Sequence, residues 1–293
     1  MGIKKVCVVG SGLMGSGIAQ VCAAAGVEVI VYDIDPAALE RALKNIAWSA
    51  GKLVEKQKIK GPLDAIMARI TSTTDLGAAA EADLCIEAVF EKLDVKQEVF
   101  AKLASMVKPE TLLASNTSAI PISSLAAGVP NPERVLGLHF FSPVPMMEAV
   151  EVVRSQFTSD EVFAQGKAFV EAIGKQPILV HKDVPGFLIN RINFPAAIEA
   201  MRLVEAGVGT VEDIDKGLRL ASGRRMGIFE TGDMVGLDVT CGALTAIYEE
   251  TKDSRWFPPA ILRRKVMAGH LGQKTGKGWY EYNPDGSRKG PAK

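Results

Sequence analysis

The sequence is poor in cysteine and histidine and has no surplus of either charge. Its four cysteines are scattered without a CxxC spacing, which argues against a disulfide framework or a zinc site. We expect all of them to be buried thiols: Cys7, Cys22, Cys85 and Cys241. Lys+Arg and Asp+Glu both number 34, so the net charge does not point to nucleic acid or an acidic membrane surface as a partner.

Long apolar runs are also missing. No stretch approaches the roughly 18 residues of a membrane-spanning helix, and the first predicted strand begins too early to leave room for a signal peptide. We therefore expect a cytoplasmic protein. The 293 residues, 47% hydrophobic and 23% charged, are typical of a soluble globular protein with two domains.

The most informative stretch is a glycine-rich turn between two predicted strands. Residues 6–9 form an apolar run rich in β-branched residues, typical of a strand buried in a parallel sheet. An alanine-rich helix is predicted over 16–25, and a second strand over 27–32 ends at Asp33. The turn itself consists of Gly10, Ser11, Gly12, Leu13, Met14 and Gly15.

This spacing suits a dinucleotide site. Gly10 permits a sharp turn, Gly12 lets backbone amides approach a pyrophosphate, and Gly15 lets the helix pack closely on the strand. Asp33 can accept hydrogen bonds from ribose hydroxyls and would repel a 2′-phosphate, so we predict NAD rather than NADP. In a chain with 28 glycines the pattern alone would also fit an ordinary turn, but the surrounding strand, helix and acid favour the cofactor.

Strands and helices continue to alternate up to about residue 184. Further strands are predicted over 70–73, 83–89, 112–115, 135–141, 147–153 and 176–180. Helices between them are predicted over 37–57, 63–68, 76–82, 91–102 and 159–173. This order predicts an α/β protein with a Rossmann-type, doubly wound sheet, in which ligands bind at the carboxyl ends of the strands.

The composition changes at Pro185. From there helices dominate, and the next strand is predicted only over 279–282. We therefore predict an NAD-binding domain over 1–184 and an all-helical domain over 185–293, whose last residues, 284–293, form a loose tail.

The helix predicted over 37–57 leads into a run of lysines. They are Lys44, Lys52, Lys56, Lys58 and Lys60. Such a run most often belongs to a solvated helix face, but beside a dinucleotide fold it could equally clamp a second, anionic ligand.

His139 is the best candidate for a catalytic base. An NAD enzyme that oxidises an alcohol needs a base for the hydroxyl proton, and His181 and His270 lie in polar stretches. A lone histidine near a strand end is often a structural imidazole, but Glu151 lies on the predicted return strand after a proline-rich turn. That arrangement would place His139 and Glu151 side by side, with the carboxylate fixing one tautomer and favouring the imidazolium.

Ser118 and Asn190 are candidates for binding the substrate oxygen. Ser118 follows the strand predicted over 112–115, where its hydroxyl could bind the substrate or belong to a helix turn. Asn190 follows the domain boundary, where its amide could stabilise a carbonyl that gains charge or make a polar interdomain hydrogen bond.

Several motifs together resemble one known family. They are Gly-Ser-Gly-Leu-Met-Gly-Ser-Gly-Ile-Ala-Gln from 10, Ser-Asn-Thr-Ser from 115, His-Phe-Phe-Ser-Pro-Val-Pro from 139, Val-Glu-Val from 150, Lys-Asp-Val-Pro-Gly-Phe-Leu-Ile-Asn-Arg from 182, Val-Gly-Leu-Asp from 235 and Lys-Thr-Gly-Lys-Gly-Trp-Tyr from 274. The combination extends over nearly the whole chain and is similar to the 3-hydroxyacyl-CoA dehydrogenase family, especially its 3-hydroxybutyryl-CoA dehydrogenases.

The resemblance implies reversible, NAD-linked oxidation of an (S)-3-hydroxyacyl-CoA in fatty acid metabolism, with a short acyl chain such as 3-hydroxybutyryl. It implies His139 as the base, Glu151 as its orienting carboxylate, and Ser118 and Asn190 as oxygen-binding residues. It also implies a homodimer formed through the helical domain, with no metal and no nucleic-acid or membrane partner.

The resemblance also implies a set of ligand contacts. The cofactor is expected at residues 10–15, Asp33, Glu91, Lys96, Ser118, Ser142 and Lys274. Coenzyme A and its acyl group are expected at Ser49, Lys56, Ser118 and Asn190.

Two departures from the family pattern leave the acyl group open. Ser142 stands where the family usually has asparagine near the nicotinamide, and Arg225-Met226-Gly227-Ile228 replaces a usual Pro-Met-Gly-Pro. The alternatives are a dehydrogenase of a free or carnitine-type 3-hydroxy acid, and a non-catalytic cofactor-binding relative. The presence of both His139 and Glu151 argues against the second alternative.

Overall fold

The computed structural model describes residues 2–292. The chain divides into two compact units between Phe187 and Leu188. Within the described residues, no helix combines the length and the apolar character that crossing a membrane requires.

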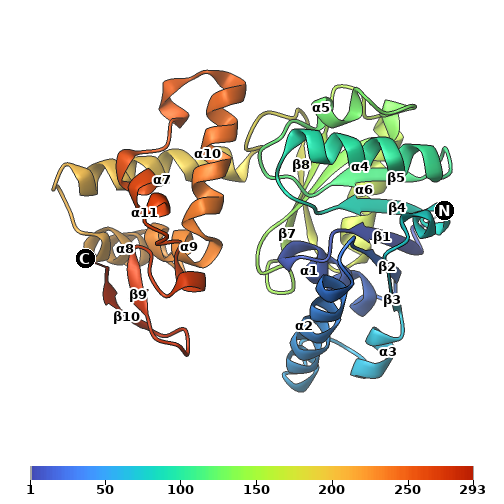
Figure 1. Cartoon of the computed structure of the whole chain (residues 1–293), viewed down its shortest axis with the longest axis horizontal. Helices are drawn as coiled ribbons and strands as arrows, with labels where there is room; N and C mark the ends of the chain where they lie inside the picture. Colours follow the sequence, from blue (N-terminus) through green and yellow to red (C-terminus); the bar gives the residue numbers. More distant parts are fainter. Residues whose placement is uncertain (1, 293) are drawn as a thin grey trace. The chain divides into compact units, whose positions relative to one another are not determined.

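The first unit is built on one eight-stranded sheet in the order β3-β2-β1-β4-β5-β6-β7-β8 (Figure 1). The strands are β1 (Lys5–Val9), β2 (Glu28–Tyr32), β3 (Ile70–Thr73), β4 (Leu84–Glu87), β5 (Leu112–Ser115), β6 (Val135–Phe140), β7 (Ala149–Arg154) and β8 (Gln176–Val180). All neighbouring strands are parallel except β6 and β7, so β7 and β8 run opposite to the rest.

Helices cover both faces of this sheet. They are α1 (Leu13–Ala24), α2 (Pro36–Glu55), α3 (Leu63–Met67), η1 (Leu76–Glu81), α4 (Leu93–Met106), α5 (Ile122–Ala126), η2 (Pro132–Arg134) and α6 (Asp160–Ala172). One hydrophobic cluster joins α1, α2, α3 and α6 to one face, and a second joins η1, α4 and α5 to the other. The predicted doubly wound α/β architecture is therefore confirmed.

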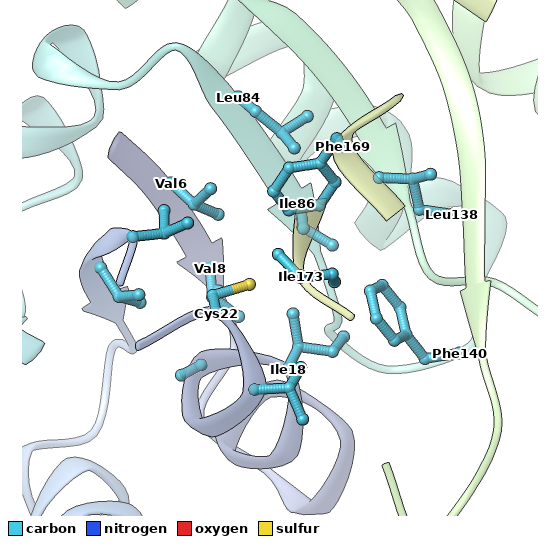
Figure 2. Packing of buried hydrophobic residues seen from close by; sticks show 14 of the residues in the cluster. Val6, Val8, Ile18, Cys22, Leu84, Ile86, Leu138, Phe140, Phe169 and Ile173 are labelled. Atoms are coloured by element: carbon cyan, nitrogen blue, oxygen red, sulfur yellow. The ribbon is translucent and has the colours of Figure 1, made fainter. Parts of the chain in front are cut away.

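The first of these clusters is densely packed (Figure 2). Val6, Val8 and Ile86 from the central strands lie in it together with Ile18 of α1 and Phe169 of α6, and all five side chains are buried. The β-branched strand residues that predicted a buried parallel sheet therefore form its core.

Most predicted elements agree with the structure to within a few residues. β3, β5 and β8 have the predicted bounds, whereas α1 begins at Leu13, inside the predicted turn. The sequence pattern does not predict α5, although it does predict the equally short α3.

The second unit is mainly helical. Its helices are α7 (Ile189–Glu205), α8 (Val211–Ser222), α9 (Ile228–Val235), α10 (Leu237–Thr251), η3 (Ser254–Trp256), α11 (Ala260–Met267) and η4 (Gln273–Thr275). The predicted helical domain is confirmed, but it also contains an antiparallel hairpin of β9 (Tyr280–Tyr282) and β10 (Arg288–Pro291). The prediction of a loose tail over 284–293 is therefore wrong for 288–291, which pairs with β9.

The cysteine prediction holds for three of the four residues. Cys7, Cys22 and Cys85 are buried free thiols, whereas Cys241 is only half-buried, and the expectation for it is wrong. Cys241 lies on α10 beside Thr240, at the edge of the stripe that this helix buries.

Candidate active site

The turn after β1 has the geometry of a phosphate-binding loop. Gly10 has a φ of +103°, which favours glycine, and a Cβ there would lie 2.7 Å from the Ala88 carbonyl oxygen. A Cβ on Gly15 would lie 1.8 Å from the Gly10 oxygen, so α1 can approach the turn only without a side chain at this position. A Cβ on Gly12 would meet open space. The loop thus requires glycine at 10 and 15 and leaves room for a ligand at 12.

The N-terminus of α1 fits an anionic group. Its N-cap residue, Gly12, makes no side-chain hydrogen bond, and the first turn contains no acidic residue. The first amides of a helix have no partner within the helix, and they attract phosphate. The pyrophosphate of NAD would be held here by the backbone of Gly12, Leu13 and Met14.

Asp33 lies directly after β2 and faces this loop. Its Oδ2 accepts hydrogen bonds from the amide and the hydroxyl of Ser11 at 2.8 and 2.7 Å, and its Oδ1 accepts one from the Asp35 amide at 3.1 Å. Burial would raise the pKa of Asp33, but the hydrogen bonds from Ser11 and the nearby amides outweigh it and lower the pKa. The ionised, half-buried carboxylate retains acceptor capacity for ribose hydroxyls.

The structure brings His139 and Glu151 together. The two residues are register partners on the antiparallel strands β6 and β7, and Nδ1 of His139 lies 2.6 Å from Oε2 of Glu151. Glu151 is fully buried and His139 is 5% exposed. The predicted side-by-side placement is confirmed, because β7 returns antiparallel to β6 after the loop over 141–148.

Aromatic rings hold the imidazole of His139. The ring centroid of Phe141 lies 4.6 Å away and that of Phe187 lies 5.7 Å away. Phe187 is fully buried although its φ is +47°, a strained conformation for a side chain of this size. Since Glu151 engages Nδ1, the ring nitrogen left for proton exchange is Nε2.

A buried ionic network lies at the carboxyl ends of β4 and β5. Lys96 Nζ lies 2.6 Å from Glu87 Oε1 and 3.1 Å from Glu91 Oε2. Glu91 Oε1 accepts hydrogen bonds from the Thr117 hydroxyl at 2.5 Å and the Ser118 amide at 3.0 Å. Desolvation raises the pKa of Glu91, but Lys96 and these donors outweigh it and lower the pKa.

The turn that follows β5 also contacts the strand of His139. The side-chain oxygen of Asn116 accepts a hydrogen bond from the Phe140 amide at 2.9 Å. Ser118 is half-buried, and within residues 2–292 its hydroxyl has no hydrogen-bond partner. Ser118 therefore presents a free hydroxyl at the strand ends where a ligand binds in such folds.

Ser49 and Lys56 share one side of α2. They are separated by two helical turns, with Ser49 half-buried and Lys56 exposed at the C-cap. In the described chain Lys56 has no ion-pair partner, whereas Lys52 pairs with Glu55 at 3.0 Å. The charge of Lys56 is therefore available to an anionic ligand.

Three more predicted site residues have different surroundings. Ser142 is half-buried in the turn after β6. Asn190 is half-buried in the first turn of α7, in the second unit. Lys274, also in the second unit, pairs with Asp238, with Nζ 2.6 Å from Oδ1.

The sequence interpretation missed one polar residue of the site, Glu87, which lies inside the strand predicted over 83–89. Asn116 and Thr117 follow the strand predicted over 112–115, where ligands are expected, but the sequence gives them no individual role. A polar side chain at the carboxyl end of a buried parallel strand was the available signal.

Models of one protein family match both parts of the chain. Residues 5–184 match the NAD-binding domain of 3-hydroxyacyl-CoA dehydrogenase, and residues 186–282 match its C-terminal domain.

Individual relatives agree with this match. A 3-hydroxybutyryl-CoA dehydrogenase from Mycobacterium tuberculosis is 42% identical, over 96% of this chain and 99% of its own length. A 3-hydroxyadipyl-CoA dehydrogenase from Escherichia coli is 41% identical, over 97% of this chain and 60% of that protein. The crystal structure of (S)-3-hydroxybutyryl-CoA dehydrogenase PaaH1 from Ralstonia eutropha has a TM-score of 0.89 and 38% identity, over 96% of this chain and 99% of that chain. The chain therefore belongs to the NAD-dependent 3-hydroxyacyl-CoA dehydrogenase family.

Proposed function

We propose that this enzyme reversibly oxidises short-chain (S)-3-hydroxyacyl-CoA esters such as 3-hydroxybutyryl-CoA, with His139 as the general base. The observation that carries the proposal is the buried 2.6 Å contact between His139 Nδ1 and Glu151 Oε2. Relatives named for 3-hydroxybutyryl-CoA support this choice of substrate.

His139 and Glu151 would work as a pair in this mechanism. Glu151 holds Nδ1–H, so Nε2 is unprotonated in the neutral ring and takes the hydroxyl proton of the substrate. NAD, when bound, supplies the hydride acceptor. A carboxylate at this distance stabilises the imidazolium that forms, and in the reverse direction the imidazolium returns its proton to the substrate oxygen.

The remaining predicted residues would bind and orient the ligands. Ser118 and Asn190 would donate hydrogen bonds to the substrate oxygen, which gains charge when the ketone is reduced. Ser49 and Lys56 would bind coenzyme A. The cofactor contacts would be the 10–15 loop with Asp33, Glu91, Lys96, Ser118, Ser142 and Lys274.

The proposal extends to the organisation of the protein. Residues 1–184 would bind NAD, and residues 185–293 would complete the substrate site and form a homodimer. The enzyme would act in the cytoplasm, in fatty acid metabolism. Light scattering coupled to size-exclusion chromatography tests the dimer, and a monomer at assay concentrations would contradict it.

Initial rates of NADH oxidation test the reaction and the substrate. We expect the highest kcat/KM with acetoacetyl-CoA and lower values with longer 3-oxoacyl-CoAs and 3-oxoadipyl-CoA. Free acetoacetate is the matched substrate without coenzyme A. Equal turnover of acetoacetate would favour a dehydrogenase of free acids, and NADH binding without turnover of any substrate would favour a non-catalytic protein.

A further inference from the structure

Glu87 is a buried carboxylate to which the proposed mechanism gives no task. It ends β4 with 0% of its surface exposed. It accepts hydrogen bonds from Lys96 Nζ at 2.6 Å, Ser115 Oγ at 2.6 Å and the Val89 amide at 2.7 Å. Burying a carboxylate is costly unless its charge is compensated, and here the Lys96 ammonium compensates it.

One chain of hydrogen bonds leads from Glu87 to the turn after β5. Ser115 Oγ donates to Glu87 Oε2 and accepts a hydrogen bond from the Thr117 amide at 3.1 Å. The carboxylate at the end of one strand therefore fixes the backbone that follows the next strand.

A second chain reaches the same turn through charged groups. Lys96 Nζ bridges Glu87 and Glu91, and Glu91 accepts hydrogen bonds from the Thr117 hydroxyl and the Ser118 amide. Together the two chains close a ring of polar contacts around the ends of β4 and β5.

Solvent exposure rises along the second chain. The side chains of Glu87 and Lys96 are 0% and 1% exposed, whereas that of Glu91 is 37% exposed. Glu91 is therefore the charged member that can reach a ligand, and Lys96 acts on it from inside the protein.

Burying a lysine does not by itself require two carboxylates in this fold. Lys175 is 8% exposed, and its Nζ donates to the carbonyl oxygens of Val144 and Met147 at 2.9 and 2.7 Å. The pairing of Lys96 with both Glu87 and Glu91 thus does more than solvate an ammonium group: it fixes two carboxylates relative to each other.

We propose that Glu87 is a positioning residue for the cofactor. Through Lys96 it fixes the carboxylate of Glu91, and through Ser115 it fixes the turn that carries Ser118. In this arrangement the contribution proposed above for Lys96 to cofactor binding is indirect, because its side chain is 1% exposed and acts by orienting Glu91. The inference rests on the proposed assignment of Glu91 and Ser118 as cofactor contacts.

Glu87→Gln in the full-length protein tests this inference. The substitution keeps the size of the side chain but brings an NH2 donor and no charge to Lys96, so Glu91 becomes the only counter-ion of the ammonium. We expect the Kd of NADH, measured by nucleotide fluorescence, to rise about tenfold. We expect kcat at saturating NADH to fall by a smaller factor, because Ser118 on the same turn is also proposed to bind the substrate oxygen. Glu81→Gln is the matched control, because Glu81 forms an exposed ion pair with Lys5 at 2.9 Å, and we expect the Kd to stay unchanged.

A double-mutant cycle separates positioning from general stability. Lys96→Met should raise the Kd similarly, and adding Glu87→Gln to it should raise the Kd by a smaller factor than Glu87→Gln does alone, because Glu87 then has no ammonium to hold and acts only through Ser115. The double variant buries no charge at these two positions, so it can still be measured if Glu87→Gln alone fails to fold. A wild-type Kd in the double variant, or losses that add, would overturn the proposal.

Thr117 provides a second, milder test. Thr117→Val removes the hydroxyl donor to Glu91 at nearly constant volume and should raise the Kd, and Thr117→Ser should restore it. An equal effect of both substitutions would contradict the hydrogen-bond chain. Because NADH binding needs no acyl-CoA, these measurements remain informative even if acyl-CoA turnover fails.

Discussion

The buried carboxylates of the two units have different partners. In the first unit, Glu87 ends β4 and Glu151 lies within β7, and they contact basic side chains, a lysine and a histidine. In the second unit, Asp215 and Asp233 accept hydrogen bonds only from backbone amides and tyrosine hydroxyls among the contacts that the structure records. The same chemical group is therefore paired with a base in one unit and holds chain segments together in the other.

The aspartates of the second unit fill spaces left by glycine. A Cβ on Gly227 would lie 2.1 Å from Asp215 Cγ, and a Cβ on Gly278 would lie 2.0 Å from Asp233 Oδ1. Burial raises the pKa of both aspartates, although amides and tyrosine hydroxyls act in the opposite direction. A buried acid without a basic side chain in contact is thus identified as scaffold, and one next to a lysine or histidine as a candidate for chemistry.

The strongest test of this comparison substitutes His139 and Glu151 in the first unit. His139→Gln should lower kcat by roughly a hundredfold or more, the usual contribution of a general base. Glu151→Gln is nearly isosteric, so it should keep the fold and the affinity for NADH yet lose much of kcat.

The two losses should also be non-additive, because a carboxylate has nothing to orient once the imidazole is gone. A double-mutant cycle on kcat measures this, with NADH binding as the control for folding. Full additivity would mean that Glu151 works independently of His139, as a structural acid like those of the second unit.

The half-buried Asp33 sharpens the comparison, because the carboxylate proposed to bind the ribose has no cationic partner within residues 2–292. We expect NADH to support turnover with a far higher kcat/KM than NADPH, since a 2′-phosphate would meet a negative charge and lose hydrogen bonds. The ratio of the two kcat/KM values should correspond to a free-energy difference on the order of a few kcal/mol. Asp33→Asn should narrow the difference. Equal kcat/KM for the two cofactors in the wild-type enzyme would rule out this assignment.

Asp233→Asn tests the scaffold side of the comparison. The substitution places an amide donor among three hydrogen-bond donors, and we expect the free energy of unfolding to fall by about 1–3 kcal/mol. The Kd of NADH should change far less, since Lys274 is the one proposed cofactor contact that lies in the second unit. Glu250→Gln, an exposed change on α10, is the control and should leave the melting temperature unaltered.

The pH dependence of the free energy of unfolding also tests the role of Asp233. Since the pKa of Asp233 is raised on folding, the native state binds this proton more tightly than the unfolded chain. Its contribution to stability therefore falls as pH rises through the range between the unfolded and folded pKa values. Asp233→Asn should remove this part of the slope, and an unchanged slope would contradict the raised pKa.

The smallest effect is expected for an exposed charge of the first unit. Lys56→Ala should raise KM for the CoA ester several-fold and leave kcat nearly unchanged, because a phosphate contact far from the reacting carbons stabilises ground and transition states alike. Lys44→Ala is the matched control, since Lys44 pairs with Glu40 at 2.6 Å on the same helix. A lower kcat with an unaltered KM would place Lys56 in the chemistry instead.

The sequence allowed accurate prediction where contacts depend on neighbouring elements. Residues 10–15 and Asp33 belong to one strand-turn-helix-strand unit, so their placement close together follows from a local motif. His139 and Glu151 lie on consecutive antiparallel strands joined by the loop over 141–148, so their proximity follows from the order of the chain.

Contacts that depend on how distant segments pack could not be predicted. Lys96 is one of many lysines on amphipathic helices, and its burial depends on where α4 docks on the sheet. Asp233 accepts a hydrogen bond from the Trp279 amide, 46 residues later in the chain, and no sequence pattern predicts that pairing. The hairpin of β9 and β10 escaped prediction for a related reason, since β10 contains glycine, proline and charged residues in place of an alternating apolar pattern.

The antiparallel pairing of β6 and β7 requires a fixed number of residues in each paired strand. Leu138 faces Val152 and Phe140 faces Val150 on either side of the His139–Glu151 pair. One residue inserted into β7 before Glu151 would turn its carboxylate to the other face of the sheet and put a valine opposite the imidazole. Within the paired parts of β6 and β7 we therefore expect the enzyme to tolerate exchanges among apolar side chains far better than any insertion or deletion.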